Sequence, residues 1–156
     1  MISSVHRFDP ILKLNTNTHW LDGSTIYGSS NATMNKIRSF KSGLVLMSNL
    51  TGRQLLPISS PCNNSACFYA GDDRATEQPQ LAVMHTIWAR EHNRVAAQLL
   101  KLNPTWTDEI VFQEARRIVV AEIQHITYDE WLPILLSKLN SGVVLSCVFD
   151  LLDKSW

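Results

Sequence analysis

Two long segments with helical periodicity constrain the fold of this chain more than any other feature of its sequence. Pro79 suits the first turn of the earlier segment, and Asn103-Pro104 ends it. Thr107 can cap the later segment, whose acidic first turn complements the helix dipole. Each segment has one apolar face, formed by Leu81, Met84, Trp88, Val95 and Leu99 in the earlier one and by Val111, Ala115, Ile118, Val119, Ile123 and Ile126 in the later one. The sequence therefore predicts a mainly α fold.

A shorter helix is expected before these segments. Ser30 or Asn31 can cap it, and Gly43 follows just beyond its expected end. Its apolar stripe would be Met34, Ile37 and Phe40. The polar stretch from Asn15 to Ser30 is predicted to be a loop.

Two further elements are predicted from turn and proline signals. Apolar residues on both sides of Asn49-Leu50-Thr51-Gly52 favour a short β-hairpin. Near the C-terminus, Trp131 to Leu136 is interrupted by Pro133, and we expect it to form a separate helix.

Composition excludes several classes of function. The chain has 156 residues, of which 45% are apolar, and its 14 basic and 14 acidic residues cancel. No block of like charge favours a nucleic-acid partner, and no apolar run is long enough for a membrane span. Residues 1–10 have no apolar core of signal-peptide length, so we expect no signal peptide in this chain.

Other features are typical of an extracellular protein. Glycosylation sequons begin at Asn31, Asn49 and Asn63. Cys62 and Cys67 flank a short polar loop that a disulfide could close, although two unrelated thiols would give the same spacing. We interpret the chain as a secretory-pathway protein without its export signal, from a truncated product or an incomplete gene model.

Two small clusters carry chemistry. In the segment Thr18 to Ser24, oxygen-bearing side chains alternate along a compact loop, as a calcium site requires; a polar turn bonded to its own backbone is the alternative. Arg74 and Glu77 lie just ahead of the first long helix. A surface ion pair would explain them as well as a functional site would.

Read together, several phrases resemble successive motifs of the animal haem peroxidases. They are Leu21-Asp22-Gly23-Ser24-Thr25-Ile26-Tyr27-Gly28-Ser29, Ala70-Gly71-Asp72-Asp73-Arg74-Ala75-Thr76-Glu77, His85-Thr86-Ile87-Trp88-Ala89-Arg90-Glu91-His92-Asn93-Arg94, Asn103-Pro104-Thr105-Trp106, Gln113-Glu114-Ala115-Arg116-Arg117 and Gln124-His125-Ile126-Thr127-Tyr128-Asp129-Glu130-Trp131-Leu132-Pro133. The resemblance is to peroxidasin-like and chorion-peroxidase-like members. It implies a partial peroxidase domain over residues 15–136, an unmatched segment 1–14 and a divergent tail 137–156.

The resemblance also assigns roles. It implies a calcium site with side-chain oxygens of Thr18, Asp22 and Ser24 and the backbone carbonyl of Trp20. It implies the Cys62–Cys67 disulfide, which is similar to that of peroxidasin-like members.

For the haem site, the resemblance makes Arg74 the distal arginine, which stabilises negative charge on bound peroxide. Glu77 would form the haem ester. Gln78 stands where the leukocyte enzyme has a methionine bonded to the haem, and glutamine cannot make that link. The implied cofactors are haem and calcium, and the implied reactants are hydrogen peroxide and an unknown reducing donor.

The histidines do not complete this site. His85, His92 and His125 fall in helix motifs that the family uses for packing and internal hydrogen bonds. The distal and proximal histidines of the family have no identifiable counterpart, because His6 lies in an unmatched context. We therefore expect the isolated chain to be inactive. Alternatives are a structural or interaction role, association with another peroxidase chain, or a fragment whose full gene encodes the enzyme.

Overall fold

The described part of the chain is mainly helical. A computed structural model describes residues 17–50, 52–59 and 67–136. Its helices are α1 (Ser24–Tyr27), α2 (Asn31–Ile37), η1 (Asp73–Thr76), α3 (Pro79–Leu102), α4 (Asp108–His125) and η2 (Ile126–Trp131), and its strands are β1 (Ser48–Leu50) and β2 (Arg53–Leu55). The predicted fold class, helical with a short hairpin, is confirmed.

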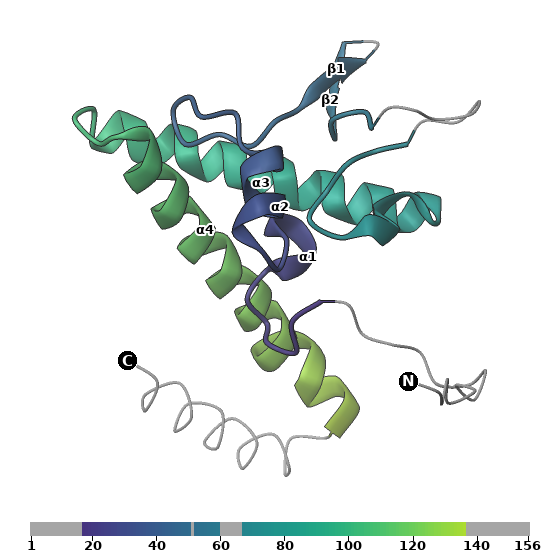
Figure 1. Cartoon of the computed structure of the whole chain (residues 1–156). Coiled ribbons are helices and arrows are strands. Elements are labelled where there is room, and N and C mark those ends of the chain that lie inside the picture. The colour runs from purple at the N-terminus through teal and green to yellow at the C-terminus, as the bar shows by residue number, and fades with distance from the viewer. Residues whose placement is uncertain (1–16, 51, 60–66, 137–156) are drawn as a thin grey trace, which may run out of the picture.

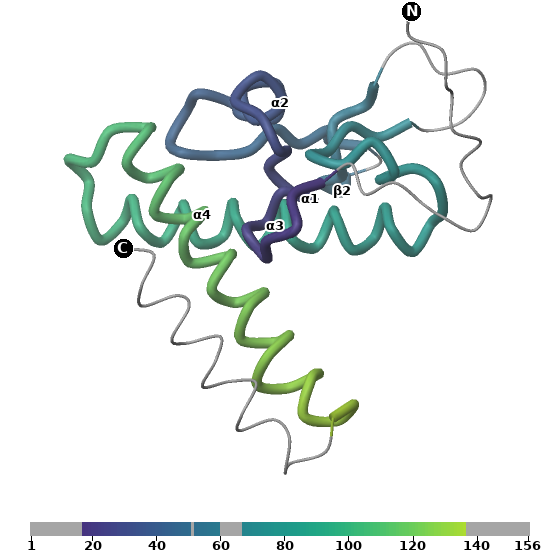
Figure 2. Tube along the Cα trace, turned by 60° about the horizontal axis from the view of Figure 1, so that its bottom comes forward, coloured from purple at the N-terminus to yellow at the C-terminus, as the bar shows by residue number. Residues whose placement is uncertain are grey.

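The two long helices form a V whose apex is the turn between them (Figure 1). Pro79 occupies the first turn of α3, and the N–H of Asn103 closes its end on the Leu99 carbonyl. Thr107 caps α4 by accepting a hydrogen bond from the Ile110 N–H. Figure 2 shows the same divergence from a second direction, so the V is not an effect of one view. The predicted limits of α3 and the predicted start of α4 are confirmed.

The short helices α1 and α2 lie on one face of the V, in front of the long helices in Figure 1 and above α3 in Figure 2. The side chain of Tyr27 on α1 is fully buried, and so is that of Phe112 on α4. Their rings meet edge to face with centroids 6.0 Å apart. The prediction of a loop missed α1, because a single turn of helix has too few residues to show a period.

A buried hydrogen-bonded chain joins three segments at this point. The Tyr27 hydroxyl lies 2.9 Å from His92 Nδ1, and His92 Nε2 lies 2.9 Å from the Gly43 carbonyl oxygen. A carbonyl only accepts, so Nε2 carries the proton and Nδ1 accepts from Tyr27. Burial, opposed by the Gly43 hydrogen bond and assisted by the charge of Arg38, lowers the pKa of His92 to about 4. His92 is therefore a neutral structural residue, as expected from its motif.

The buried face of α3 differs from the one predicted. Its buried residues are His85, Thr86, Ala89, His92, Val95 and Ala96, whereas Met84 is half exposed. Trp88 and Leu99 pack only at the edge of the core. Ala89 lines a small cavity with Ile26, Ile37 and Val45, so this face packs against segments far away in sequence, and a pattern of large apolar residues does not reveal it.

The short helix also ends earlier than predicted. Ser30 is its N-cap, as expected, but α2 stops at Ile37 and Arg38 is already extended. The buried Arg38 guanidinium bonds to Asp108 and Glu109 at the start of α4, at 2.7 Å and 2.5 Å. The chain then turns through left-handed positions, including Phe40 at φ 55°, which leaves Phe40 exposed rather than in an apolar stripe.

The hairpin is confirmed. β1 and β2 pair antiparallel, with Asn49 opposite Gln54. Arg90 on α3 donates its guanidinium N–H groups to the Gln54 carbonyl and so ties the hairpin to the long helix.

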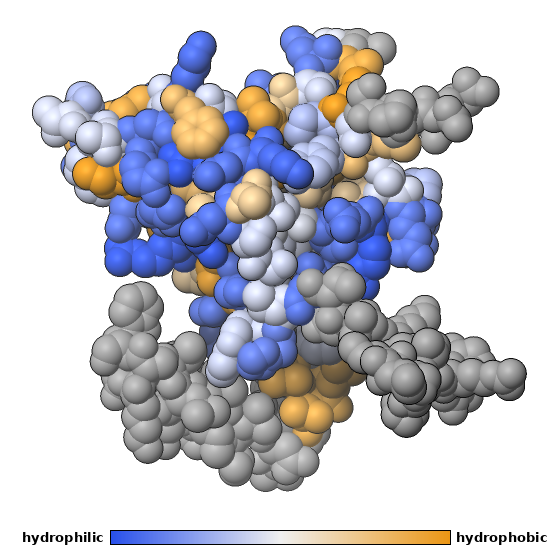
Figure 3. Space-filling view, in the orientation of Figure 1, coloured by the Kyte–Doolittle hydropathy of each residue, from blue (hydrophilic) through white to orange (hydrophobic). Residues whose placement is uncertain are grey.

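The segment after Tyr128 is not a separate helix. α4 continues through the π-helical turn η2 into helical residues 132–136. Pro133 lacks an N–H and its ring crowds the preceding turn, and a wider π turn accommodates both effects. The exposed large apolar side chains of this segment are Ile126, Trp131, Ile134, Leu135 and Leu136. Figure 3 shows an orange patch at the lower end of the described chain. Within the described residues, the helices are too polar or too short to cross a membrane.

Acid should unfold the protein through His92. The unfolded chain takes up this proton near the usual pKa of 6.5, but the folded chain does so only near 4. The associated stability is complete above pH 6.5 and is lost between these values, by roughly 3 kcal/mol. Denaturant unfolding at several pH values measures this loss.

A variant pair isolates the effect. His92→Gln should be less stable at pH 7 but should lose this part of the pH dependence. His125→Gln, at an exposed position, should keep it. If the free energy of unfolding falls with pH equally in the wild type and in His92→Gln, His92 is not the group responsible for the loss.

Candidate functional site

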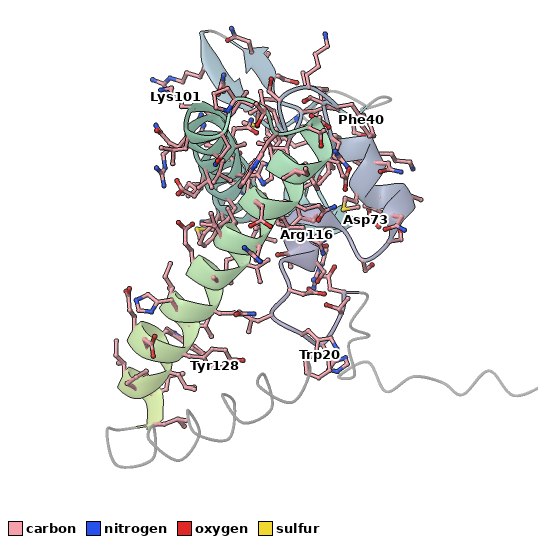
Figure 4. The ribbon with its side chains drawn as sticks, turned by 90° about the vertical axis from the view of Figure 1, so that its left-hand side faces the viewer. Trp20, Phe40, Asp73, Lys101, Arg116 and Tyr128 are labelled. Carbon is pink, nitrogen blue, oxygen red and sulfur yellow. The ribbon has the colours of Figure 1, made fainter. Side chains whose placement is uncertain are left out.

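The loop that precedes α1 gathers oxygen atoms. The Thr18 hydroxyl donates to Asp22 Oδ1 at 2.8 Å and lies 3.0 Å from the Ser24 hydroxyl. It is also 3.4 Å from the carbonyl oxygen of Trp20. The four predicted calcium ligands therefore converge on one side of the loop, although Figure 4 shows the Trp20 side chain itself at the loop's outer edge.

Asp22 is the only carboxylate among these groups. Burial raises its pKa, but hydrogen bonds from Thr18 and from the Ser24 N–H outweigh burial, and the net shift is downward. Asp22 is thus an ionised, hard oxygen donor near neutral pH. In the described part of the chain, no group of three His, Cys, Asp or Glu side chains could hold a metal ion. The oxygen donors fit calcium, and the remaining ligands that calcium requires would have to come from elsewhere.

The segment that carries Arg74 packs directly against this part of the chain. The Gly71 N–H donates to the Ile26 carbonyl at 3.1 Å. A Cβ atom at Gly71 would lie 2.2 Å from the Gly28 nitrogen and 2.6 Å from the Ile26 carbonyl oxygen. Only glycine permits this approach, which places residues 70–74 beside the end of the oxygen-rich loop.

Arg74 is held by Asp72. The guanidinium donates Nε at 3.1 Å and Nη2 at 2.8 Å to the two carboxylate oxygens, and the Arg74 backbone N–H adds a third bond at 3.0 Å. Asp72 is buried and its pKa is lowered, chiefly by the Arg74 side chain. The arginine side chain is 53% exposed, so its guanidinium is oriented but accessible. Arg74 thus pairs with Asp72 rather than with Glu77.

Glu77 and Gln78 line a groove along the start of α3. The groove has a volume of about 520 Å³ and has walls from β2, the segment before η1, and α3, with mainly apolar side chains. Leu55, Phe68, Ala82, Val83 and Ile87 form its apolar part. A mainly apolar groove of this size with a carboxylate at its rim fits a flat apolar cofactor.

The other predicted histidines differ in their surroundings. His85 is buried beside a small apolar cavity of about 20 Å³, and burial lowers its pKa. His125 is exposed, and its Nδ1 lies 2.6 Å from Asp129. His85 has a packing role as expected, whereas His125 belongs to the surface rather than to the core.

Some predicted sites lie partly outside the described residues. Cys67 is disulfide-bonded, but Cys62 is not among the described residues, so their pairing stays a prediction. Asn31 and Asn49 are exposed, as a glycan requires, and Asn63 is also not described.

Sequence reasoning missed two residues that belong to this site. Asp72 is the N-cap of η1, and its position two residues before Arg74 is a capping signal that could have identified it. Asn17 donates to Asp72 Oδ2 at 2.9 Å across 55 residues of sequence, and no local signal could have shown this contact.

Comparison with known proteins identifies relatives. The family model described as animal haem peroxidase matches residues 3–148, a wider range than the motifs cover. The chain is 46% identical over 126 residues to chorion peroxidase of Drosophila melanogaster, covering 76% of this chain and 16% of that protein. It is 44% identical over 145 residues to the human (Homo sapiens) peroxidasin homolog, covering 84% and 10%.

A solved structure agrees with these matches. Peroxidase A from Dictyostelium discoideum aligns with a TM-score of 0.65 and 34% identity, over 73% of this chain and 24% of that one. The chain thus spans less than a quarter of the length of each of these three relatives.

Proposed function

The chain belongs to the animal haem peroxidase family, and we propose that it contributes part of a haem site at which hydrogen peroxide oxidises a reducing donor. One observation carries the proposal. Asp72 orients Arg74, and Glu77, three residues later, lines a mainly apolar groove. Family membership makes haem the group that this groove would accept.

Arg74 would act on peroxide as a fixed cation. Its guanidinium keeps its charge at any relevant pH, and the hydrogen bonds that it donates to Asp72 raise its pKa. A cation held in place stabilises the negative charge that develops as an O–O bond breaks. Because Asp72 sets the orientation, no reorganisation of the side chain is needed during the reaction.

Glu77 and the groove would hold the cofactor. We propose that Glu77 is the carboxylate that forms an ester with haem, while apolar residues such as Val83 and Ile87 exclude water from one side. Bound haem supplies the redox chemistry. Gln78 lines the same groove and cannot form the sulfonium bond of a methionine, so halide-oxidising chemistry tuned by that bond is not proposed.

His85 and His92 do not supply the rest of the site. Both ring nitrogens of His92 are hydrogen-bonded inside the core, and His85 is buried against apolar residues. Haem peroxidase chemistry also needs an iron ligand and a group that moves the peroxide proton. We propose that these come from outside the described residues, on this chain or on another peroxidase chain.

Haem titration of the full chain tests the proposal. The sequence alone led us to expect an inactive chain, but under this proposal groups outside the described residues complete the site. We therefore expect a saturable Soret band distinct from that of free haem, together with peroxide-dependent oxidation of a dye donor. Arg74→Ala should lower the oxidation rate about 100-fold, as expected when a charge-stabilising donor is removed.

Arg53→Ala provides the control, because Arg53 is exposed on the hairpin. It should leave the rate unchanged. A featureless titration, with turnover no higher than that of free haem, would sink the proposal.

We also propose that the oxygen-rich loop binds calcium through Thr18, Asp22, Ser24 and the Trp20 carbonyl. The convergence of these groups supports it. Calcium should raise the melting temperature of the chain, since a ligand that binds only the folded state stabilises it. A chelator should reverse the shift.

Charge neutralisation at Asp22 provides the decisive comparison. Asp22→Asn should remove the calcium-induced shift, whereas Asp129→Asn, at an exposed carboxylate on η2, should retain it. An identical response of Asp22→Asn and the wild type would show that calcium binds elsewhere or not at all.

We propose an extracellular location. The exposed sequons at Asn31 and Asn49 and the disulfide at Cys67 support it. Chain secreted from a eukaryotic host for the assays above should lose mass on endoglycosidase treatment; an unchanged mass would argue against glycosylation.

A further inference from the structure

We propose that Asn17 is a positioning residue for Arg74 and acts through Asp72. Asp72 Oδ2 accepts the Asn17 side-chain amide at 2.9 Å and Arg74 Nη2 at 2.8 Å. Asp72 Oδ1 accepts the Arg74 Nε and backbone N–H at 3.1 Å and 3.0 Å. One carboxylate therefore receives donors from two distant segments of the chain.

Asn17 fixes the plane of this carboxylate. A carboxylate binds two guanidinium donors well only when the two planar groups are nearly coplanar. Rotation of the Asp72 side chain would break that alignment, and the Asn17 amide opposes the rotation by holding Oδ2. Asp72 is only 6% exposed, so water cannot readily replace a lost donor.

The arrangement leaves Arg74 both oriented and able to bind. A guanidinium has five N–H donors. Two point at Asp72, one from Nε and one from Nη2, and five minus two leaves three for a ligand. Because the arginine side chain is 53% exposed, it would otherwise sample several rotamers.

Asn17 also joins Arg74 to the oxygen-rich loop. It immediately precedes Thr18, whose hydroxyl contacts Asp22 and Ser24. The Gly71 backbone contact with Ile26 and Gly28 forms a second link between the same two segments. Two separate contacts thus make the loop and the Arg74 turn a single unit.

The inference rests on the proposed role of Arg74, but it is tested without haem, peroxide or calcium. In the ¹⁵N-labelled full chain, hydrogen exchange of the Arg74 Nε–H is measured by NMR at pH 6. We expect exchange about tenfold faster in Asn17→Leu, which has a similar size but no amide donor. Asn17→Asp should exchange faster still, because its charge would repel Asp72.

Two controls separate positioning from general stability. Asn35→Leu makes the same change at an exposed position on α2 and should leave the Arg74 exchange rate unchanged. The buried Ala96 backbone N–H reports on the core and should exchange equally in all variants.

Unchanged Arg74 exchange in Asn17→Leu and Asn17→Asp would overturn the proposal. So would a uniform acceleration at Arg74 and Ala96, which would show only a structural role. If the exchange changes as expected while Arg74→Ala leaves oxidation intact, the positioning contact stands and the proposed function fails.

Discussion

The close approach of Gly71 to the backbone of Ile26 and Gly28 is the constraint on which the rest of the site depends. Two backbones touch there with no room for a side chain, and the Gly71 N–H bonds to the Ile26 carbonyl. On one side of the contact lies the oxygen-rich loop that leads into α1. On the other lie Asp72 and Arg74, followed by Glu77 at the groove. Residues more than 40 positions apart in sequence, Gly71 and Ile26 with Gly28, therefore form one local structure.

The core holds the backbone of residues 26–28 in place. Tyr27, next to the contact, donates to His92 on α3, and its ring lies against Phe112 on α4. The Arg116 guanidinium on α4 lies over the Tyr27 ring, 5.4 Å from its centroid. Figure 4 shows Arg116 reaching towards α1. Burial keeps the Tyr27 hydroxyl protonated by raising its pKa, so it remains a donor. The buried His92 thus holds Tyr27, and with it the backbone that Gly71 contacts, while the Arg74 side chain is exposed to solvent.

Sequence reasoning succeeded where the determining signal was local. Pro79, Thr107 and Asn103-Pro104 set helix limits through their own backbones, and the structure has these limits. It failed where distant residues decide the structure. The buried face of α3 depends on distant segments, since Ala89 lines a cavity with Ile26 and Val45, and α2 stops early because Arg38 turns towards Asp108. The contact of Asn17 with Asp72 joins residues with no shared pattern, so only the fold reveals it.

The free energy of unfolding of Gly71→Ala tests the central claim most directly. The new methyl group would collide with backbone atoms that cannot move without displacing α1, so the account predicts a loss of about 3 kcal/mol or more. Gly52→Ala is the matched control, since its Cβ would meet nothing within 4 Å and only its φ of +76° opposes alanine. That control should cost about 1 kcal/mol. If Gly71→Ala costs no more than Gly52→Ala, the loop and the Arg74 turn are not joined as described.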